Sequence, residues 1–267
     1  MENIIEVKDL RKKYGKFEAL KGVELTLGKS QILGFIGPNG AGKTTTNCIL
    51  LGMLKGEGQA KLFRMDAWDD AVEIHKRLSY VPGDVTLWPN LTGGEVIDFF
   101  LKLKNQSNSE YKNELIKKFD LDITKKCKTY SKGNRQKVAL IAALSSDVDL
   151  YIFDEPTSGL DPLMESLFQE EVKKLKDRGK AILLSSHILS EVEKLCDSIC
   201  IIKEGMIIEN GRLDEMRHLK STKLKVKTKN PILNIEKFPV YNIEKDEEAV
   251  TFNVDDHNIS SKRNANK

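Results

Sequence analysis

The stretch Gly37–Thr44 reads GPNGAGKT and fits the pattern G-x-x-x-x-G-K-[S/T]. An apolar run at residues 31–36 precedes it, and residues 43–54 have helical character. Glycines let a backbone wrap around a phosphate, so its N–H groups can point inward, and the following helix adds the positive end of its dipole. In such a loop Lys43 neutralises phosphate oxygens and the Thr44 hydroxyl is placed to hold Mg²⁺. The stretch therefore predicts a nucleotide-binding loop between a strand and a helix, and the simpler alternative is a glycine-rich turn.

A second apolar run, at residues 150–153, ends in the two carboxylates Asp154 and Glu155. Parallel sheets bind ligands at the carboxyl ends of their strands, so Asp154 suits a partner of Mg²⁺. Glu155 suits a general base or a group that positions water. An Asp-Glu pair after a strand is common, and its weight here comes from occurring with the glycine-rich loop. The residues predicted to hold the metal are Thr44 and Asp154.

The alternation of short apolar runs with longer helical patterns predicts an α/β fold with a mainly parallel sheet. Residues 181–184 form a further apolar run bounded by polar residues, as expected of a strand buried on both faces. Residues 199–202 and 206–208 predict a late hairpin that turns at Glu204-Gly205. The core is therefore expected to contain several crossover units.

Two regions differ from this core. Residues 84–147 are helical in pattern and rich in Lys, and the TGGE sequence at 92–95 has the form of a capping box. They predict a helical subdomain inserted into the core. Residues 224–229 and 250–254 alternate with period two, which predicts a small C-terminal β appendage. The expected domains are residues 1–216 and residues 217–267.

Composition excludes several classes of protein. The chain has 267 residues, of which 40% are hydrophobic and 31% charged, so general disorder is excluded. The longest charge-free stretch, residues 30–42, is interrupted by Gly and Pro and falls short of the ~20 apolar residues of a membrane span. The first residues lack the features of a secretory signal, so we expect a cytosolic chain. Four scattered cysteines without a C-x-x-C pair predict buried reduced thiols, with a metal or redox site as the alternative.

The charge distribution argues against an obligate nucleic-acid binder. Residues 217–267 carry 11 Lys or Arg and 7 Asp or Glu, a net charge of +4. The whole chain has a net charge of +3, which leaves −1 for residues 1–216. A nucleic-acid-binding domain usually shows a concentrated basic face. We therefore predict no nucleic-acid partner.

Further motifs surround the two carboxylates. Residues 130–137 read YSKGNRQK upstream of Asp154, residues 158–161 read SGLD downstream of it, and His187 ends the run LSSH. This order resembles the ATP-binding subunits of ABC transporters, with Walker A, signature, Walker B, D-loop and H-loop in sequence. The resemblance covers about residues 4–216 and implies a P-loop NTPase core of the ABC type. Within the family the chain is similar to the ATPases of drug, antibiotic and lantibiotic exporters.

The resemblance implies a role for individual residues. Tyr14 would stack on adenine, although a tyrosine before the turn at Gly15 could also be a plain surface residue. Ser131 and Gly133 would contact the γ-phosphate bound by the opposite subunit, and His187 would contact the γ-phosphate and help to hold the attacking water. With Lys43 and Glu155, His187 completes the predicted catalytic set. The full set of candidate nucleotide-binding residues is Tyr14, Gly37, Pro38, Asn39, Gly40, Ala41, Gly42, Lys43, Thr44, Thr45, Ser131, Gly133 and Asp161.

The chain departs from the family pattern at two places. Lys132 stands where the signature normally has glycine, which either adds a positive charge near the partner's nucleotide or points to solvent. Gly83 stands where the family usually has the Q-loop glutamine, and Asp84 follows it. That glutamine normally reaches Mg²⁺ and links the site to the membrane partner. Water or Asp84 would have to make that link here, if anything does.

The resemblance implies that the chain binds ATP with Mg²⁺ and hydrolyses ATP to drive a separate integral-membrane permease, with export favoured over import. Two ATPase subunits, identical or paralogous, would dimerise head to tail around two nucleotides. The subunit would then lie on the inner face of the cell membrane through its permease. The alternatives are a non-transport ABC ATPase acting on nucleic acid or in translation, a GTPase, and a regulatory ATP-binding module. The chain lacks the long insertions or tandem cassettes of the first and the N-K-x-D motif of the second.

Overall fold

The computed structural model describes residues 3–106, 110–213, 221–227, 235, 240–245 and 249–255. The chain divides into two compact units, Met1–Asn210 and Gly211–Lys267. The domain boundary predicted after residue 216 lies outside the described residues. The two units are therefore described separately.

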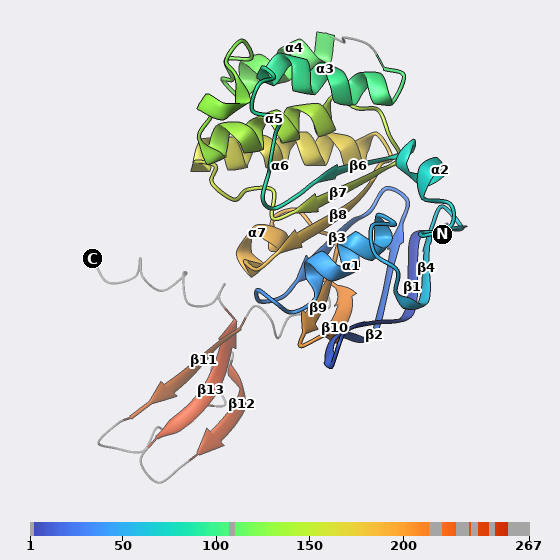
Figure 1. The fold of residues 1–267 in the computed structure, drawn as a ribbon. Coiled ribbons are helices and arrows are strands. Elements are labelled where there is room, and N and C mark those ends of the chain that lie inside the picture. The colour runs from blue at the N-terminus through green and yellow to red at the C-terminus, as the bar shows by residue number, and fades with distance from the viewer. Residues whose placement is uncertain are drawn as a thin grey trace, which may run out of the picture. The chain divides into compact units, whose positions relative to one another are not determined.

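A six-stranded sheet forms the centre of the first unit, in the order β10-β9-β3-β8-β7-β6 (Figure 1). Strand β3 pairs in parallel with β8 and β9, and β7 pairs in parallel with β6 and β8. Every residue of β3, β7 and β8 is buried, as the apolar runs predicted. The predicted hairpin forms at β9 and β10. The bounds are β3 Ile32–Ile36, β6 Leu78–Val81, β7 Leu150–Asp154, β8 Ala181–Ser186, β9 Ser198–Lys203 and β10 Met206–Arg212.

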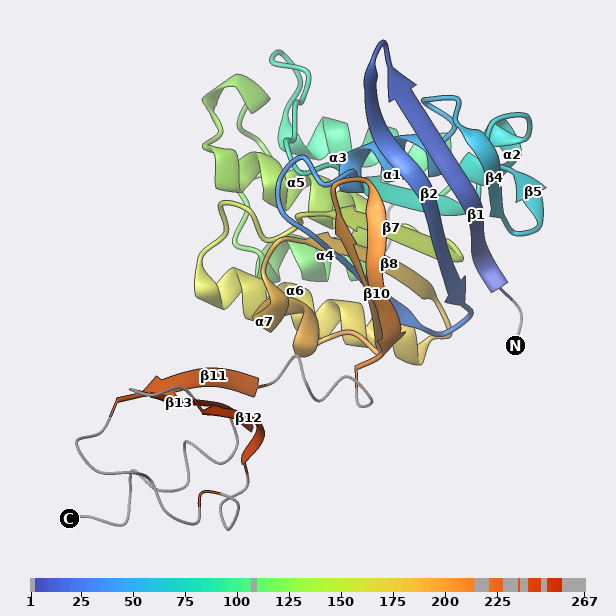
Figure 2. The same ribbon diagram turned by 90° about the horizontal axis from the view of Figure 1, so that it is seen from below.

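Helices follow the strands and cover both faces of this sheet. Helix α1 packs between the sheet and a second, antiparallel sheet, because Ile49 and Leu50 share one buried cluster with residues of both sheets. Figure 2 shows α6 and α7 on the other side of the parallel strands. The parallel sheet with helices on both faces confirms the predicted α/β fold. The bounds are α1 Lys43–Leu50, α2 Ala71–His75, α6 Pro162–Asp177 and α7 Leu189–Glu193.

The antiparallel sheet has the order β2-β1-β4-β5 and was not predicted. Its longest pair, β1 with β2, shifts register between Val7 and Leu10. Asp9 lies within this shift and has a φ of 44°. The irregularity breaks the period-two alternation that would reveal the strand in the sequence. The bounds are β1 Asn3–Tyr14, β2 Phe17–Gly28, β4 Glu57–Leu62 and β5 Met65–Asp66.

The inserted region is helical, as expected. The predicted capping box is present, since the Thr92 hydroxyl accepts from the Glu95 N–H at 3.2 Å and the Glu95 carboxylate accepts from the Thr92 N–H at 2.7 Å. Glu171 of α6 is fully buried and accepts hydrogen bonds from Tyr111 and Lys118 of α4, which ties this region to the core. The bounds are α3 Gly93–Leu103, α4 Glu110–Lys118, the 3-10 helix η1 Cys127–Thr129 and α5 Lys132–Leu144.

The second unit contains a three-stranded antiparallel sheet in the order β11-β13-β12. Its strands are β11 Ser221–Val226, β12 Val240–Lys245 and β13 Val250–Asp255. This agrees with the predicted β appendage. Over the described part of the whole chain, none of the helices combines the length and apolar character needed to cross a membrane.

Candidate active site

The candidate site lies where three adjacent parallel strands end. Strand β3 runs into the glycine-rich loop after Ile36, β7 ends at Asp154, and β8 ends at Ser186. The register pairs Ile36 with Ser186 and Asp154 with Ser185, so the three carboxyl ends are level. The topology therefore brings the loop, the two carboxylates and His187 to one edge of the sheet.

The glycine-rich loop presents free backbone donors. Gly40 and Gly42 have φ values of 80° and 116°, a left-handed backbone that favours glycine. A Cβ at Gly42 would lie 2.7 Å from Leu20 Cδ2, so a side chain would also clash there. Among the described residues, nothing accepts a hydrogen bond from the N–H groups of Gly40, Gly42, Lys43 and Thr44. Unused N–H groups at the start of α1 are the geometry that binds phosphate.

Lys43 is almost completely buried, with 5% of its surface exposed. Its ammonium donates to the carbonyl oxygens of Gly37 at 2.6 Å and Pro38 at 3.3 Å. It also lies 3.5 Å from Glu155 Oε1. The loop thus folds around its own lysine, and a phosphate would replace uncharged carbonyl partners with a stronger charged one.

Asp154 keeps one oxygen without a partner. Its Oδ2 accepts from the Thr44 hydroxyl at 3.1 Å, while Oδ1 is buried and has no hydrogen bond within the described structure. Burial raises the pKa of Asp154, and the nearby Thr44, Asn47 and Ser185 side chains oppose the rise. A buried carboxylate with an open oxygen is expected to attract a cation.

The sequence did not reveal two polar neighbours of this carboxylate. Asn47 of α1 donates from Nδ2 to Ser185 Oγ at 2.9 Å, and both side chains are buried. Asn47 Oδ1 has no partner in the described structure. Asn47 lies one helical turn after Lys43, so both residues are on the same face of α1. A polar residue at this spacing on a buried face is the sequence feature that could have identified Asn47 as part of the site. Ser185 follows an apolar run and gave no signal of its own.

Glu155 and His187 meet beside Lys43. Glu155 has a φ of 47°, an uncommon conformation for a residue other than glycine, and its N–H donates to Ser185 O at 3.0 Å. The distance between Glu155 Oε1 and His187 Nδ1 is 3.2 Å. The carboxylate therefore contacts a lysine on one side and an imidazole on the other, the arrangement of a group that holds a reacting water.

The glycine in the Q-loop position lies against this site. A Cβ at Gly83 would be 3.2 Å from Asp154 O and 3.6 Å from Glu155 Cβ. The position therefore has little room for a side chain unless the backbone shifts. Asp84 is exposed.

The remaining predicted residues have other contacts. Ser131 caps α5 by accepting from the Asn134 N–H at 3.3 Å, and Asp161 caps α6 by accepting from the Met164 N–H at 3.0 Å. Nothing in the described structure joins Ser131, Gly133 or Asp161 to the glycine-rich loop. Their predicted nucleotide contacts stay predictions, and for Ser131 and Gly133 they require a second subunit.

Tyr14 ends β1 beside the turn at Gly15 and is 47% exposed. The Lys12 ammonium lies 5.5 Å from the centre of its ring. The ring is therefore open enough to stack on a base, and its predicted role stays a prediction.

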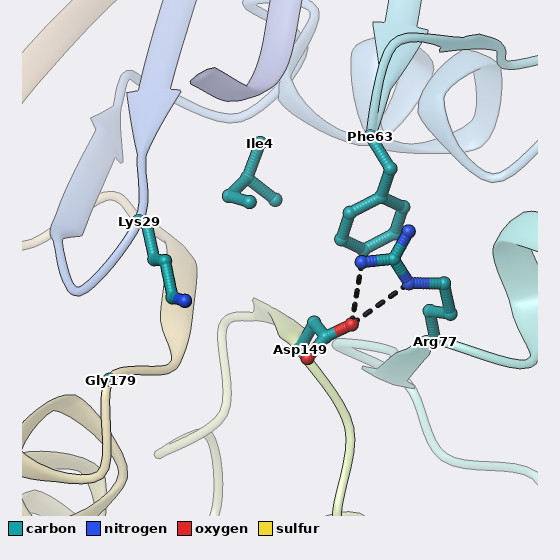
Figure 3. Close-up of a pocket in the computed structure, with 6 residues that line it drawn as sticks. All are labelled: Ile4, Lys29, Phe63, Arg77, Asp149 and Gly179. Carbon is teal, nitrogen blue, oxygen red and sulfur yellow. Dashed lines mark hydrogen bonds and ion pairs between the residues drawn. The ribbon is translucent and has the colours of Figure 1, made fainter. Parts of the chain in front are cut away.

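A surface pocket of about 110 Å³ lies at the opposite edge of the sheet (Figure 3). Asp149 and Gly179, which line it, precede β7 and β8. The Arg77 guanidinium donates to one Asp149 oxygen and lies 3.9 Å from the centre of the Phe63 ring. Because Phe63 follows β4 and Arg77 precedes β6, these contacts join the two sheets, and the pocket is remote from the candidate site.

The residues present fit a nucleoside triphosphate with Mg²⁺. The loop offers free amides and a lysine for phosphates, and the Thr44 hydroxyl adjoins the Asp154 carboxylate. Among the described residues, His, Cys, Asp and Glu side chains form no cluster of three or more that could hold a metal. Two protein oxygens agree with the coordination of Mg²⁺, which takes its other ligands from phosphate and water.

Comparison with known proteins extends this result. A family model described as ABC transporter matches residues 20–158. An uncharacterized ABC transporter ATP-binding protein of Nostoc sp. is 37% identical over 228 residues, which cover 80% of this chain and 68% of the relative. The linearmycin resistance ATP-binding protein of Bacillus subtilis is 31% identical, over 78% of this chain and 70% of its own. A solved dimeric structure of a bacterial ABC transporter cassette is 25% identical with a TM-score of 0.71, and covers 78% of this chain and 98% of that one.

Proposed function

The chain belongs to the ATP-binding subunits of the ABC transporter family, and we propose that its site binds ATP with Mg²⁺ and hydrolyses it to ADP and phosphate. The observation that carries the proposal is the open, buried Oδ1 of Asp154 beside the Thr44 hydroxyl and the unused amides of the glycine-rich loop. If the glycine-rich loop were only a turn without a ligand, nothing would offset the free-energy cost of burying the Asp154 carboxylate in this way.

The loop and its lysine would bind the phosphates. Lys43 Nζ now contacts the Gly37 carbonyl, and a phosphate at the loop would accept from this ammonium and from the free amides together. Thr44 and Asp154 would hold Mg²⁺, which when bound neutralises part of the phosphate charge. The loop donors are fixed before the ligand arrives, so little reorganisation is needed during reaction.

Glu155 would act as general base or position the attacking water. His187 would contact the γ-phosphate and help to hold this water, and its Nδ1 would also hold the Glu155 carboxylate in place. The 3.2 Å contact from His187 Nδ1 and the fixed backbone at Glu155 restrict where the carboxylate points. Neighbouring strand ends carry both residues, so their geometry is set by the sheet rather than by a long loop.

Each nucleotide would be shared between two subunits. Within the described structure no hydrogen bond joins Ser131 or Gly133 to the glycine-rich loop of their own chain, and they would serve the nucleotide of a second subunit. A dimeric relative supports this arrangement. The second subunit is the same chain or a paralogue.

A separate integral-membrane permease would use the energy of hydrolysis, with this subunit on the cytoplasmic side of the membrane. The relative named for linearmycin resistance supports export as the direction. The proposed domains are an ABC ATPase at residues 1–216 and a β appendage at residues 217–267.

The test uses Glu155→Gln, which keeps the shape of the side chain and removes the general base. Hydrolysis should fall by about 10² to 10⁴, and the variant should form a stable dimer with MgATP but not with MgADP. Light scattering after size-exclusion chromatography measures the dimer. A Glu155→Gln protein that stays monomeric in saturating MgATP, or that dimerises equally with MgADP, would refute the shared site.

The matched control adds Ser131→Arg to Glu155→Gln. The added side chain blocks only the contact with the partner's nucleotide, so the dimer should be lost while ATP binding to the monomer is kept. Since Ser131 also caps α5, thermal unfolding is measured to show that the double variant remains folded.

A further inference from the structure

The N-terminal half of α5 contacts the loop that follows Glu155 in the same chain. Gln136 Nε2 donates to Pro156 O at 2.9 Å in a buried position. A Cβ at Gly133 would lie 2.6 Å from Gly159 O, so the two backbones approach as closely as glycine allows. Residues 156–159 are therefore held by the turn that carries the signature sequence.

Lys132 adds a contact that the usual glycine of the family could not make. Its ammonium donates to Ser158 Oγ at 2.9 Å. Its Cγ and Cδ atoms lie 3.5 Å from the point that a Cβ on Gly159 would occupy, so the side chain extends across this residue. In the described structure Ser158 is its hydrogen-bond acceptor, and no carboxylate pairs with it.

Ser158 leads back to the reacting end of the site. Its N–H donates to Glu155 O at 3.1 Å and closes a turn between the two residues. The backbone of Glu155 is in the left-handed region, and its side chain contacts His187. The position of this turn therefore affects the direction of the Glu155 carboxylate.

We infer that Lys132 is a positioning residue that acts on Glu155 through Ser158. It couples the turn bearing Ser131 and Gly133 to the general base of the same chain. The inference rests on the proposed hydrolysis of ATP. It assigns Lys132 a role within its own subunit, in place of a contact with solvent or with the partner's nucleotide.

The experiment compares steady-state ATP hydrolysis of Lys132→Met with that of the full-length wild-type chain. We expect kcat to fall about fivefold, the effect of one hydrogen bond of ordinary net strength, with KM within about twofold. Lys132→Arg should restore most of the rate, because a guanidinium can donate to the same hydroxyl. Ser158→Ala should lower kcat by a similar factor, and the double variant should be no slower than either single variant.

The control is Lys128→Met, which removes one positive charge from η1, outside the signature sequence. Lys128 is exposed and its side chain has no partner within the described structure, so this variant should keep the wild-type kcat. Thermal unfolding of Lys132→Met should match the wild type. A merely structural role would lower the unfolding midpoint together with kcat, and would overturn the inference.

Two further outcomes distinguish a failure of the inference about Lys132 from a failure of the proposed ATPase. A Lys132→Met protein as fast as the wild type, or one whose effect adds fully to that of Ser158→Ala, would overturn the inference and leave the proposed ATPase intact. The proposed function would be overturned, and the inference with it, if the wild-type chain did not hydrolyse ATP and the Glu155→Gln variant did not dimerise with MgATP.

Discussion

Two buried carboxylates lie in different parts of the first unit and have opposite surroundings. Asp154, at the edge of the parallel sheet, is 3% exposed and has the Thr44 hydroxyl on one oxygen and, among the described residues, no partner on the other. Glu171, on α6, has no exposed surface and accepts from Lys118 at 3.0 Å, from Lys174 at 2.7 Å and from the Tyr111 hydroxyl. The second carboxylate is satisfied by its own chain, and the first is not.

Their pKa values differ accordingly. Burial raises the pKa of Asp154 above its ordinary value. Burial acts in the same direction on Glu171, but hydrogen bonds from Lys174, Tyr111 and Lys118 outweigh it and lower the pKa of this carboxyl. Burial alone therefore does not mark a functional carboxylate. The distinguishing feature is a charge that the fold leaves open for a ligand.

The largest expected effect separates function from stability at Asp154. Asp154→Asn should lower ATP hydrolysis by at least about 100-fold, because an amide holds Mg²⁺ weakly. The unfolding midpoint of the nucleotide-free protein should stay the same or rise, since the variant removes a poorly compensated buried charge. Phosphate release and thermal unfolding measure the two quantities.

The stabilisation of the wild type by MgATP should also be lost in Asp154→Asn. A variant that hydrolyses ATP at the wild-type rate would contradict the assignment of Asp154. A large fall in the nucleotide-free unfolding midpoint would instead make Asp154 a structural residue like Glu171.

Glu171→Gln should show the reverse pattern. We expect it to lower the free energy of unfolding by about 2 to 4 kcal/mol, below the largest effects of breaking buried ion pairs because Lys118 and Lys174 can regain water. ATP hydrolysis per folded molecule should be unchanged. Urea unfolding measures the stability, and Glu170→Gln is the matched control because Glu170 is the exposed neighbour on the same helix.

A loss of hydrolysis in folded Glu171→Gln would show that α4 and α6 affect the active site. A loss of stability in Glu170→Gln as large as that in Glu171→Gln would show that the buried network is not its source.

The contributions of Glu171 and Asp154 to the free energy of unfolding should depend on pH in opposite directions. The pKa of Glu171 is lowered by folding, so its contribution to stability is present above about pH 4.3, the unfolded value, and is lost as pH falls below it. The pKa of Asp154 is raised by folding, so wild-type stability falls as pH rises through the window above about 3.9.

Urea unfolding at a series of pH values therefore gives two trends. The deficit of Glu171→Gln against the wild type should shrink as the solution becomes acidic. The advantage of Asp154→Asn should shrink too, because protonation removes the charge that the variant lacks. Gaps that do not change with pH would contradict the opposite assignments.

The sequence predicted one of these carboxylates and not the other, for physical reasons. Asp154 follows an apolar run and pairs with a glycine-rich loop, so local pattern places it at a strand end. Glu171 acquires its meaning from Tyr111 and Lys118, which only the packing of α4 on α6 brings near it. Residues whose role comes from a distant partner leave no local signal.

The same distinction applies elsewhere in the chain. Strands β3, β7 and β8 of the parallel sheet were predicted because each contains a run of consecutive apolar residues. Strand β1 was not predicted because the left-handed backbone at Asp9 interrupts its alternation. The contact of Lys132 with Ser158 could not be predicted, because the sequence left a solvent-facing lysine equally open.

The smallest expected effect compares two tyrosines that accompany the two carboxylates. Tyr111→Phe removes a hydrogen bond to Glu171 and should lower the free energy of unfolding by about 0.5 to 1.5 kcal/mol. The ring remains, and the Arg178 guanidinium 4.9 Å from its centre keeps its contact, so the change isolates the hydroxyl.

Tyr80 is half-buried near Asp154, whose charge adds to burial in raising the pKa of Tyr80. The Tyr80 hydroxyl nevertheless has no hydrogen bond within the described structure. Tyr80→Phe should therefore change stability by less than about 0.5 kcal/mol. Urea unfolding of both variants at neutral pH provides the comparison. Equal losses in the two would mean that the Tyr80 hydroxyl is bonded within the chain as firmly as the Tyr111 hydroxyl, and the contrast between the surroundings of the two carboxylates would not extend to their tyrosines.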